Sequence, residues 1–480
     1  MKLIFEKSSE GRRCSLLPRL DVAEYKLGGR ALNLPEISEV DLVRHYTALS
    51  KRAYGVDDGF YPLGSCTMKY NPKVNEDAAK LSGFTKIHPL QPEDTVQGAL
   101  QVIYMLSGAL KEISGMDAVS LQPAAGAQGE YAGLLVIKKY LESIGQSVRD
   151  KIIVPDSAHG TNPATANSLG FKIINIPSDE RKMVDIDALK AAVGEDTAAL
   201  MLTNPNTLGL FDSGIEEIVK IVHDAGGLLY YDGANLNAVM GISRPGDMGF
   251  DVMHFNLHKT FSTPHGGGGP GAGPIGCKEF LREFLPEPAV IKEGGRYRMV
   301  NPARSVGKIK AFYGNFNVCV KALAYIMTLG REGLKKTSEI AVLNANYMLK
   351  SLSDTISNDY SSPCMHEFVL SFEKLKEETG VTSLDIAKAL IDSGIHPPTI
   401  YFPLIVHEAA MFEPTETESK ETLDWAVSIL KALYKKAHES PGEFKNMPQK
   451  AAVTRPDDVQ AARFPKLIYI ASSSYNGRRD

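Results

Sequence analysis

The sequence predicts an α/β fold built around a mainly parallel β-sheet. Between about residues 100 and 280, segments with helical periodicity alternate with short apolar runs, the order typical of strand–helix–strand units. Most of these apolar runs are nearly continuous, as expected for strands that are buried on both faces. The composition, with 43% hydrophobic and 23% charged residues in a chain of 480, is that of an ordinary globular protein.

The central region begins with a helix and continues with strands and helices in turn. Residues 130–144 place Leu134, Ile137, Leu141 and Ile144 on one helical face, with Lys138 and Lys139 turned away from it. The sequence then predicts, in order, strands at 152–155 and 171–176, a helix near 187–193, a strand at 198–203, a helix at 215–224 and strands at 228–231 and 252–257. This order predicts a single doubly wound domain.

The flanking regions predict two further parts. Residues 1–90 are punctuated by proline and glycine and are expected to form an N-terminal arm or extension, with helical patches at 38–50 and 76–80. We expect residues 91–330 to form the large domain and residues 331–480 to form a small α+β domain with a tail. A helical stretch at 317–329 and 334–352 leads to the α+β part. That part is expected to contain strands at 367–372 and 399–402, helices at 383–393 and 420–437, and a charged, proline-bearing surface extension at 439–465.

Charge and cysteine content exclude several classes of protein. The 53 Lys+Arg against 57 Asp+Glu give a net charge of −4, which makes nucleic acid a poor partner. No apolar stretch approaches the ~18 residues of a membrane span, and the apolar part of the start is too short for a signal peptide, so we expect a cytoplasmic protein. The cysteines are odd in number and lack a CxxC pair, which argues against disulfides and structural zinc: Cys14, Cys66, Cys277, Cys319 and Cys364.

Two polar residues follow apolar strands at positions that suit catalysis. Lys259 comes after the strand predicted at 252–257 and before a glycine-rich bend, where open α/β sheets bind their ligands. Asp232 ends the strand predicted at 228–231. Taken alone, a surface lysine and a helix-capping aspartate are the alternatives. Together they form the pair that a pyridoxal phosphate (PLP) enzyme requires, because the acid keeps the pyridine nitrogen protonated and the lysine binds the aldehyde as a Schiff base.

Two further segments could complete such a site. His159 lies just past the strand predicted at 152–155, and its flat ring could stack on a flat cofactor, although a lone histidine more often caps a helix or packs. Residues 122–130 (Gln-Pro-Ala-Ala-Gly-Ala-Gln-Gly-Glu) lead directly into a helix with small side chains. Backbone N–H groups at a helix start bind phosphate, and a well-packed tight turn is the alternative. Because all these segments lie at strand or helix ends, they jointly favour a PLP site.

Other cofactor classes fit the sequence less well. The glycine run at 266–269 lacks the Gly-Lys-Ser/Thr ending of a P-loop, and no GxGxxG follows the first strand. His254 and His258, with His265 nearby, could suggest a metal site. On a strand, however, two histidines four residues apart would lie about 13 Å from each other. We therefore expect no metal cofactor.

Several segments resemble one known family, in the same order and along nearly the whole chain. The most specific are residues 256–261 (Asn-Leu-His-Lys-Thr-Phe) and the glycine-rich run at 264–276. The others lie at 59–71, 122–133, 157–164, 232–238, 397–403 and 413–418. On these motifs the chain resembles the P-protein of the glycine cleavage system, and in particular the second subunit of its two-subunit form. The single-chain form of the family is longer, and this sequence is similar to its C-terminal half.

The resemblance implies a fold and a set of cofactor contacts. The fold would be that of a fold-type I PLP enzyme, similar to aspartate aminotransferase, with a seven-stranded sheet. As catalytic residues it implies Lys259 bonded to PLP, Asp232 paired with the pyridine nitrogen and His159 stacked on the ring, with Ala234 packed against the other face. The residues expected around the phosphate are the backbone groups of Gly126, Ala127 and Gln128, with His258 and Thr260 beside the lysine.

One matching segment near the expected mouth of the site has no implied role. It contains Ser65, Cys66, Thr67 and Lys69. Cys66 could be taken for a nucleophile, but PLP chemistry needs none. We therefore expect this cysteine to be buried or to pack within its loop.

The resemblance also implies a reaction and its partners. The chain would decarboxylate glycine with PLP and pass the aminomethyl group to the lipoyl arm of H-protein. Because it matches only half of the long form, it would need P-protein subunit 1, with two copies of each subunit in a heterotetramer. The residues that bind the glycine carboxylate cannot be read from the sequence.

Three other functions stay open on the residues alone. Another fold-type I PLP enzyme, such as an aminotransferase or an amino-acid decarboxylase, would share the lysine and the aspartate. A non-catalytic interaction subunit is the second alternative, and the presence of Lys259, Asp232 and His159 argues against it. A metal-dependent hydrolase built on the three histidines named above is the third.

Overall fold

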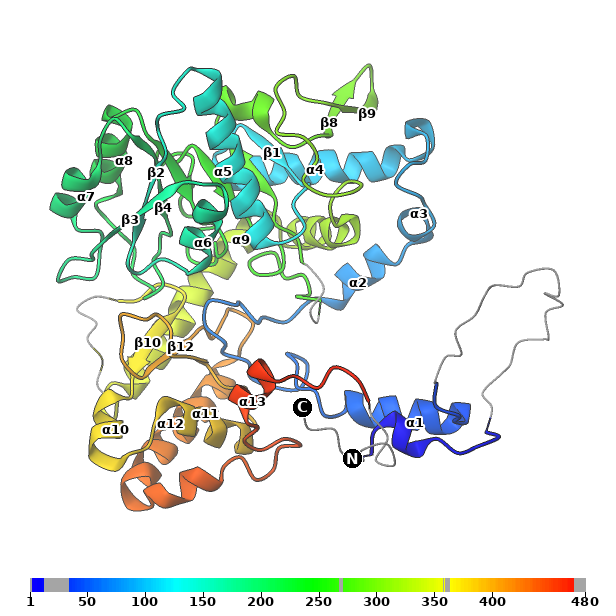
Figure 1. Cartoon of the computed structure of the whole chain (residues 1–480), viewed down its shortest axis with the longest axis vertical. Coiled ribbons are helices and arrows are strands. Elements are labelled where there is room, and N and C mark those ends of the chain that lie inside the picture. Colours follow the sequence, from blue (N-terminus) through cyan, green and yellow to red (C-terminus); the bar gives the residue numbers. More distant parts are fainter. Residues whose placement is uncertain (1, 13–33, 267–270, 357, 359–362, 470–480) are drawn as a thin grey trace, which may run out of the picture. The chain divides into compact units, whose positions relative to one another are not determined.

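The computed structural model describes residues 2–12, 34–266, 271–356, 358 and 363–469, so Cys14 lies outside the described residues (Figure 1). The chain divides into two compact units. One unit comprises Met1–Asp58 and Pro448–Asp480, and the other comprises Gly59–Met447. Within the described residues, no helix combines the length and the apolar character that crossing a membrane requires.

The smaller unit contains short helices. The helix α1 (Glu39–Ser50) begins after Ser38, whose hydroxyl accepts a hydrogen bond from the Asp41 N–H, so the helical patch predicted at 38–50 is confirmed. The other elements described in this unit are η1 (Ile4–Lys7) and α13 (Asp458–Arg463).

The larger unit is built on a seven-stranded sheet with the strand order β1-β7-β6-β5-β4-β2-β3. Its strands are β1 (Ala118–Ser120), β2 (Lys151–Pro155), β3 (Lys172–Ile176), β4 (Thr197–Leu202), β5 (Leu228–Tyr231), β6 (Val252–His254) and β7 (Ile275–Cys277). The five strands from β3 to β6 pair in parallel, whereas β7 runs antiparallel to both β6 and β1. The predicted mainly parallel sheet is confirmed.

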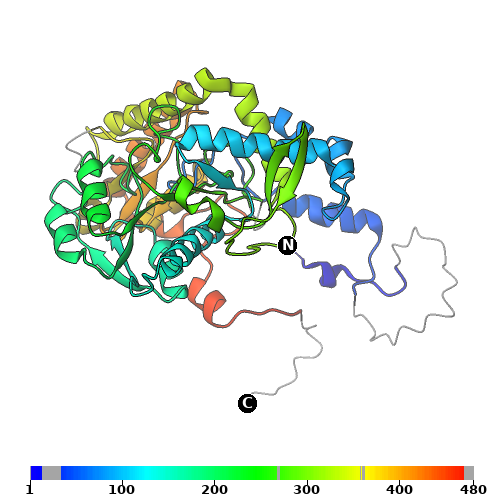
Figure 2. The same cartoon turned by 90° about the horizontal axis from the view of Figure 1, so that it is seen from above.

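Helices cover both faces of this sheet (Figures 1 and 2). The strand side chains alternate between two cores: Tyr230 packs in the core that includes α5 (Gly126–Ser143), and Tyr231 packs in the opposite core. The helices of the two faces are α5 and α6 (Thr161–Ser168) on one side, and α4 (Gln97–Ser114), α7 (Ile186–Ala192), α8 (Ile215–Asp224) and the first part of α9 (Phe316–Leu352) on the other. The doubly wound arrangement is therefore as predicted.

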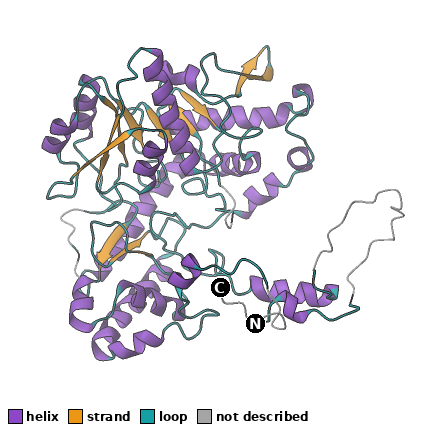
Figure 3. Ribbon diagram, viewed as in Figure 1, coloured by secondary structure: helices purple, strands orange, loops and turns teal. Residues whose placement is uncertain are grey.

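The C-terminal part of the larger unit has its own sheet and core (Figure 3). The strands β10 (Phe368–Ser371), β12 (Ala409–Phe412) and β11 (Thr399–Ile400) form an antiparallel sheet in that order. The helices α10 (Glu373–Thr379), α11 (Ser383–Asp392) and α12 (Lys420–Glu439) pack beside it. The helix α9 links the two parts and is broken at Gly330, which has a φ of 61°. This glycine lies between the two helices predicted there.

Two predicted boundaries differ from the structure. The strand predicted at 252–257 ends at His254, because the Phe255 and Leu257 N–H groups bond to Pro274 and Ala272 outside the strand ladder, at 2.8 and 3.0 Å. The helix predicted from residue 130 begins at Gly126, since its first turn is made of small residues that carry no apolar periodicity. The strand β3 is also more exposed than predicted, because it lies at the edge of the sheet.

The remaining elements of the larger unit are short. They are α2 (Lys73–Ala79), α3 (Ser82–Thr85), η2 (Glu93–Thr95), η3 (Glu279–Phe284), η4 (Pro441–Asn446) and a hairpin of β8 (Ala289–Glu293) and β9 (Arg296–Val300). The helix α2 lies at the patch predicted at 76–80.

Candidate active site

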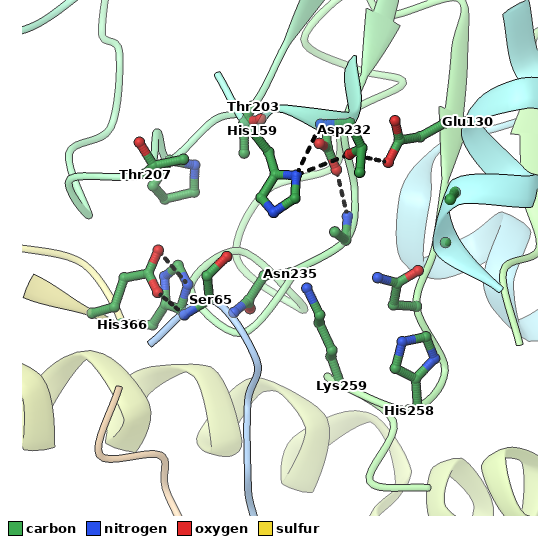
Figure 4. Close-up of a pocket in the computed structure, with 17 residues that line it drawn as sticks. Ser65, Glu130, His159, Thr203, Thr207, Asp232, Asn235, His258, Lys259 and His366 are labelled. Atoms are coloured by element: carbon green, nitrogen blue, oxygen red, sulfur yellow. Dashed lines mark hydrogen bonds and ion pairs between the residues drawn. The ribbon is translucent and has the colours of Figure 1, made fainter. Parts of the chain in front are cut away.

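A cavity of about 240 Å³ lies where the parallel strands end. Residues that follow β2, β4, β5 and β6 line it, together with the start of α5, as expected for an open α/β sheet (Figure 4). The lining residues are Ser65, Gly126, Ala127, Glu130, His159, Thr161, Thr203, Pro205, Thr207, Asp232, Ala234, Asn235, Asn256, His258, Lys259, His366 and Glu367.

Most of the predicted cofactor residues meet in this cavity. They are Gly126, Ala127, His159, Asp232, Ala234, His258 and Lys259. Two others do not line it. The Gln128 side chain bonds to the Ala124 N–H and the Ile309 carbonyl, at 2.6 and 3.0 Å. Thr260 is buried, and its hydroxyl accepts a hydrogen bond from the Leu236 N–H at 2.9 Å.

Asp232 is held at the end of β5 by backbone and histidine groups. Its N–H bonds to the Leu202 carbonyl at 2.8 Å, and its Oδ1 accepts from the Ala234 N–H at 3.1 Å. The Nε2 of His254 faces the same oxygen at 3.4 Å, while its Nδ1 lies 2.8 Å from the Tyr230 hydroxyl. Burial lowers the pKa of His254 and raises that of Tyr230 well above its ordinary value. Tyr230 therefore donates to Nδ1, and His254 presents its Nε2–H to Asp232.

The histidines His254, His258 and His265 do not form a metal site, because His254 and His258 contact different partners. His254 supports Asp232, whereas His258 packs against His265, with ring centroids 5.1 Å apart. Among the described residues, the group whose ligand atoms lie close enough for a metal is a different one: His366, Glu367 and Glu413.

The end of the cavity next to α5 is suited to an anion. The helix α5 begins without a side-chain cap, so its first N–H groups and the positive end of its dipole open toward Gly126 and Ala127. Two buried polar atoms beside it, Asn256 Oδ1 and His258 Nδ1, have no hydrogen-bond partner among the described residues. Burial lowers the pKa of His258 to about 3, so this ring is neutral.

Close backbone packing holds this end in place. A side chain at Gly273 would come within 2.0 Å of the Ala125 carbonyl, and one at Gly129 within 2.6 Å of the Gly273 carbonyl. Only glycine allows the first turn of α5 to approach the segment after Lys259 so closely. The lysine and the helix start are therefore fixed against each other.

His159 presents its ring to the cavity beside Asp232 (Figure 4). The Thr161 N–H donates to its Nδ1 at 3.2 Å, and the Thr161 hydroxyl lies 2.9 Å from the same nitrogen. That hydroxyl also lies 2.9 Å from Oε1 of Glu130. The partial removal of His159 from water lowers its pKa. The ring is therefore neutral, with its proton on Nε2.

Glu130 was not predicted as a site residue. It is buried in the first turns of α5, and burial together with the nearby Asp232 carboxylate raises its pKa to about 8. Protonated Glu130 can donate to the Thr161 hydroxyl, and this hydroxyl can then donate to Nδ1 of His159. Each of these two hydrogen bonds thus has one donor and one acceptor. An acidic residue on the buried face of a predicted helix was the signal that could have found it.

Replacing Glu130 with glutamine is expected to stabilise the cofactor-free protein above pH 4.5. Below pH 4.5 Glu130 contributes its full stability. This contribution is lost as the pH rises toward about 8, the pKa of Glu130 in the folded protein, because the unfolded chain releases the proton first. Glutamine has no proton to release, and we expect it to gain up to about 3 kcal/mol at pH 7. Thermal unfolding between pH 4.5 and 8 measures this, with the exposed Glu216→Gln as the control. Equal pH dependence in wild type and variant would contradict it.

The opposite wall comes from the segment predicted near the mouth and from the C-terminal sheet. Ser65 and Thr67 both have left-handed backbone conformations, with φ of 65° and 51°. Two buried carboxyl groups fix them: Glu367 accepts from the Ser65 N–H at 2.8 Å, and Glu413 from the Thr67 N–H at 3.0 Å. Strained conformations of this kind persist only where the surroundings impose them, and they often mark functional sites.

The other residues of the same segment are buried or partly buried. Lys69 forms a buried ion pair with Glu416 at 2.9 Å and contacts the Tyr325 hydroxyl at 3.2 Å. Burial raises the pKa of the Cys66 thiol, although Lys259 acts in the opposite direction. A thiol that keeps its proton supports the packing role expected for Cys66. Cys277, Cys319 and Cys364 are buried free thiols, in agreement with the sequence.

The cavity thus combines the groups that a flat cofactor with an anionic tail requires. Lys259, the Asp232 carboxylate and the His159 ring all line it, with His159 beside Asp232 (Figure 4). The uncapped start of α5, with its free N–H groups, lies at the anion end. These observations fit PLP.

Comparison with known proteins shows close sequence relatives. Residues 29–391 match the model of the glycine cleavage system P-protein family, and residues 337–453 match that of the glycine dehydrogenase C-terminal domain. A probable glycine dehydrogenase (decarboxylating) subunit 2 of Treponema denticola is 60% identical over 476 residues, covering 98% of both chains. The protein of the same name from Thermotoga maritima is 56% identical over 467 residues, covering 96% of this chain and 98% of its own.

Solved structures share the fold. A glycine decarboxylase (P-protein) of the glycine cleavage system, in inhibitor-bound form, aligns with a TM-score of 0.72 and 20% identity over 85% of this chain and 92% of its own. A cysteine desulfurase from Thermococcus onnurineus aligns with a TM-score of 0.60 and 17% identity over 79% of this chain and 95% of its own. These neighbours are fold-type I PLP enzymes, which confirms the predicted fold class.

Proposed function

The chain belongs to the P-protein family of the glycine cleavage system, and from this premise we propose that it carries the catalytic site for PLP-dependent glycine decarboxylation. It would act as one subunit of the P-protein and pass the aminomethyl group to the lipoyl arm of H-protein. One observation carries the proposal: Lys259, Asp232 and the uncapped start of α5 open into the same cavity.

The residues of the cavity divide into those that would hold the cofactor and those that would tune it. Lys259 would hold it through the ε-amino group, and the first N–H groups of α5 would bind its phosphate. Bound PLP supplies an electron sink for the bond that breaks at the substrate carbon. Asp232 would keep a proton on the pyridine nitrogen, and its contact with His254 holds the carboxylate in place for this.

Lys259 would also move a proton, and His159 and Ala234 would enclose the cofactor ring. Lys259 is the only lysine or arginine among the described residues that line the cavity, so its Nζ can take up and return the proton that the incoming amine releases. His159 would lie against the cofactor ring on one side and Ala234 on the other. The neutral state of His159, fixed through Thr161, gives it a flat uncharged face for stacking.

The partners follow from the family. Relatives of this chain are named subunit 2, which implies a subunit 1. A heterotetramer with two copies of each subunit, and lipoylated H-protein as the acceptor, remain part of the proposal. So does a cytoplasmic location, for which the composition is the support. The division into residues 1–90, 91–330 and 331–480 likewise stays a prediction.

Isotope exchange tests the proposed function. The chain is co-purified with subunit 1 and incubated with glycine, lipoylated H-protein and ¹³C-bicarbonate. We expect ¹³C to enter the carboxyl group of glycine, because decarboxylation is reversible at this step. If the loaded complex instead transfers amino groups to an oxo acid and shows no exchange, the chain is another fold-type I PLP enzyme and the proposal is wrong.

A further inference from the structure

The end of the cavity away from α5 has a different character from the anion end. Ser65, Thr207 and His366 lie together there, apart from His258 and Glu130 (Figure 4). Glu367 completes this wall. No arginine is found among the described residues that line the cavity, although an amino-acid substrate brings a carboxylate into it. Among the described residues at this end, a carboxylate would therefore meet Ser65, Thr207, His366 and Glu367.

Two buried carboxyl groups at this end differ in their hydrogen bonds. Glu413 accepts from the Thr67 N–H and hydroxyl, at 3.0 and 2.7 Å, and from the side-chain amides of Asn235 and Asn237, at 2.9 and 3.0 Å. Such a set of donors stabilises an ionised carboxylate. Glu367 accepts from the Ser65 N–H, and its oxygens lie within 4.8 Å of those of Glu413.

The surroundings of Glu367 favour its protonated form. Burial, followed by the nearby Glu413 carboxylate, raises the pKa of Glu367 well above its ordinary value. A carboxyl group that stays protonated is a hydrogen-bond donor as well as an acceptor. Glu367 can therefore face an anion in the cavity without repelling it.

His366 is a buried side chain whose Nε2 lies 3.8 Å from Glu367 Oε1, too far for a hydrogen bond. It is 2% exposed, and neither of its ring nitrogens makes a hydrogen bond among the described residues. Burial lowers its pKa, so the ring is neutral and offers one N–H. Because an unsatisfied buried polar group costs free energy, a ring left in this state beside a cavity indicates a ligand.

The backbone holds these two residues in place. The Met365 N–H donates to the Gly209 carbonyl at 2.7 Å. Gly209 has a φ of 72°, and a side chain there would come within 1.9 Å of the Glu367 carbonyl. Glycine at this position thus allows residues 365–367 to lie against the loop after β4.

A metal ion suits this cluster less well than an anion. Both oxygens of Glu413 accept N–H or O–H groups, which would have to be displaced before the carboxylate could bind a cation. The groups that remain for a ligand are the Glu367 carboxyl, a His366 N–H and the Ser65 side chain, and all of them can donate.

We propose that Glu367, as a neutral carboxylic acid, and His366, as a neutral imidazole, bind the carboxylate of the amino-acid substrate in place of an arginine. The inference rests on the proposed function, which brings glycine into this cavity. Neutral donors orient the carboxylate but stabilise its charge less than a guanidinium would. A weakly stabilised carboxylate loses carbon dioxide more readily, since its ground state is not lowered.

The first test compares glycine with methylamine, which has the amino group but no carboxylate. Binding of both to the PLP-loaded two-subunit enzyme is followed by the change in cofactor absorbance. We expect His366→Phe to weaken glycine binding by about tenfold or more and to leave methylamine binding unchanged. His366→Asn, which keeps an N–H donor, should retain part of the preference for glycine. Equal effects on both amines, or no effect on either, would overturn the proposal.

The second test uses pH and Glu367→Gln. The titratable groups that act on Glu367 or lie beside it are Glu413, His366, Lys259, Cys66 and Cys364. In wild type, the preference for glycine over methylamine should fall as the pH rises and Glu367 loses its proton. In the glutamine variant the amide keeps its donor, so that fall should disappear and affinity at neutral pH should change by less than about threefold.

The outcomes separate this proposal from the function on which it rests. If Glu367→Gln binds glycine about tenfold more tightly than wild type, Glu367 is an anion. If the pH dependence of the glycine preference is the same in Glu367→Gln and wild type, the proton of Glu367 has no role. Either result overturns the inference. Bicarbonate exchange by the wild type would still support glycine decarboxylation in that case. Absence of exchange in the wild-type complex would instead reject the proposed function.

Discussion

Replacing Lys259 with alanine is expected to remove the visible absorbance of the bound cofactor and to lower glycine–bicarbonate exchange by about 10⁴-fold, equal to about 5 kcal/mol in the activation free energy. Lys259 is the only lysine or arginine among the described residues lining the cavity, so no other side chain on this wall can take its place. Absorbance spectra of the purified two-subunit complex and the exchange assay measure the two effects.

The exposed Lys139 on α5 provides a matched control. Lys139→Ala makes the same chemical change away from the cavity and should leave spectrum and exchange unchanged. A PLP–lysine spectrum that persists in Lys259→Ala would show that the cofactor bonds to a different lysine.

Replacing Asp232 with asparagine is expected to leave the fold and the cofactor bond intact but to lower the exchange rate by about 10³-fold. The amide has nearly the shape of the carboxylate but cannot hold a positive charge on the pyridine nitrogen. Asp232 Oδ1 accepts from the Ala234 N–H, and His254 Nε2 lies 3.4 Å from the same oxygen, so the carboxyl group is held in place. Exchange rates and the cofactor spectrum of the same preparation separate catalysis from binding.

Asp187 on the surface of α7 is the control for this substitution. Asp187→Asn should behave as wild type. An Asp232→Asn enzyme that exchanges bicarbonate at near-wild-type rates with subunit 1 present would remove Asp232 from its proposed role.

The catalytic strand ends could be predicted because their signals are local. Asp232 and Lys259 each follow a short, continuously apolar run, and parallel strands bring their carboxyl ends to one edge of the sheet. The same logic placed His159 after β2. By contrast, β1 and β7 are each three residues long, too short for any periodicity to show.

The wall that faces Lys259 could not be predicted, because it depends on tertiary packing. His366 and Glu367 precede β10, and no motif links them to the strand ends of the large sheet. Their environment arises when Glu413 and Ser65 approach from distant parts of the chain. Whether Glu367 keeps its proton depends on that burial, which a sequence pattern does not contain.

Glu130 illustrates the same limit within a predicted element. The sequence predicts the helix over 130–144, and Leu134, Ile137 and Leu141 form its buried face as predicted. Ile144, predicted on the same face, is exposed because the helix ends at Ser143. The acid at its start could be assigned to the site only when the structure showed Thr161 and His159 beside it.

Chemical mapping of the cofactor tests the central claim most directly. The PLP-loaded two-subunit complex is reduced with borohydride, digested and examined by peptide mass spectrometry. We expect the pyridoxyl group on Lys259, within the peptide that contains His258 and Thr260. A pyridoxyl group found on another lysine of this chain, or on subunit 1 alone, would contradict the assignment of this cavity as the PLP site.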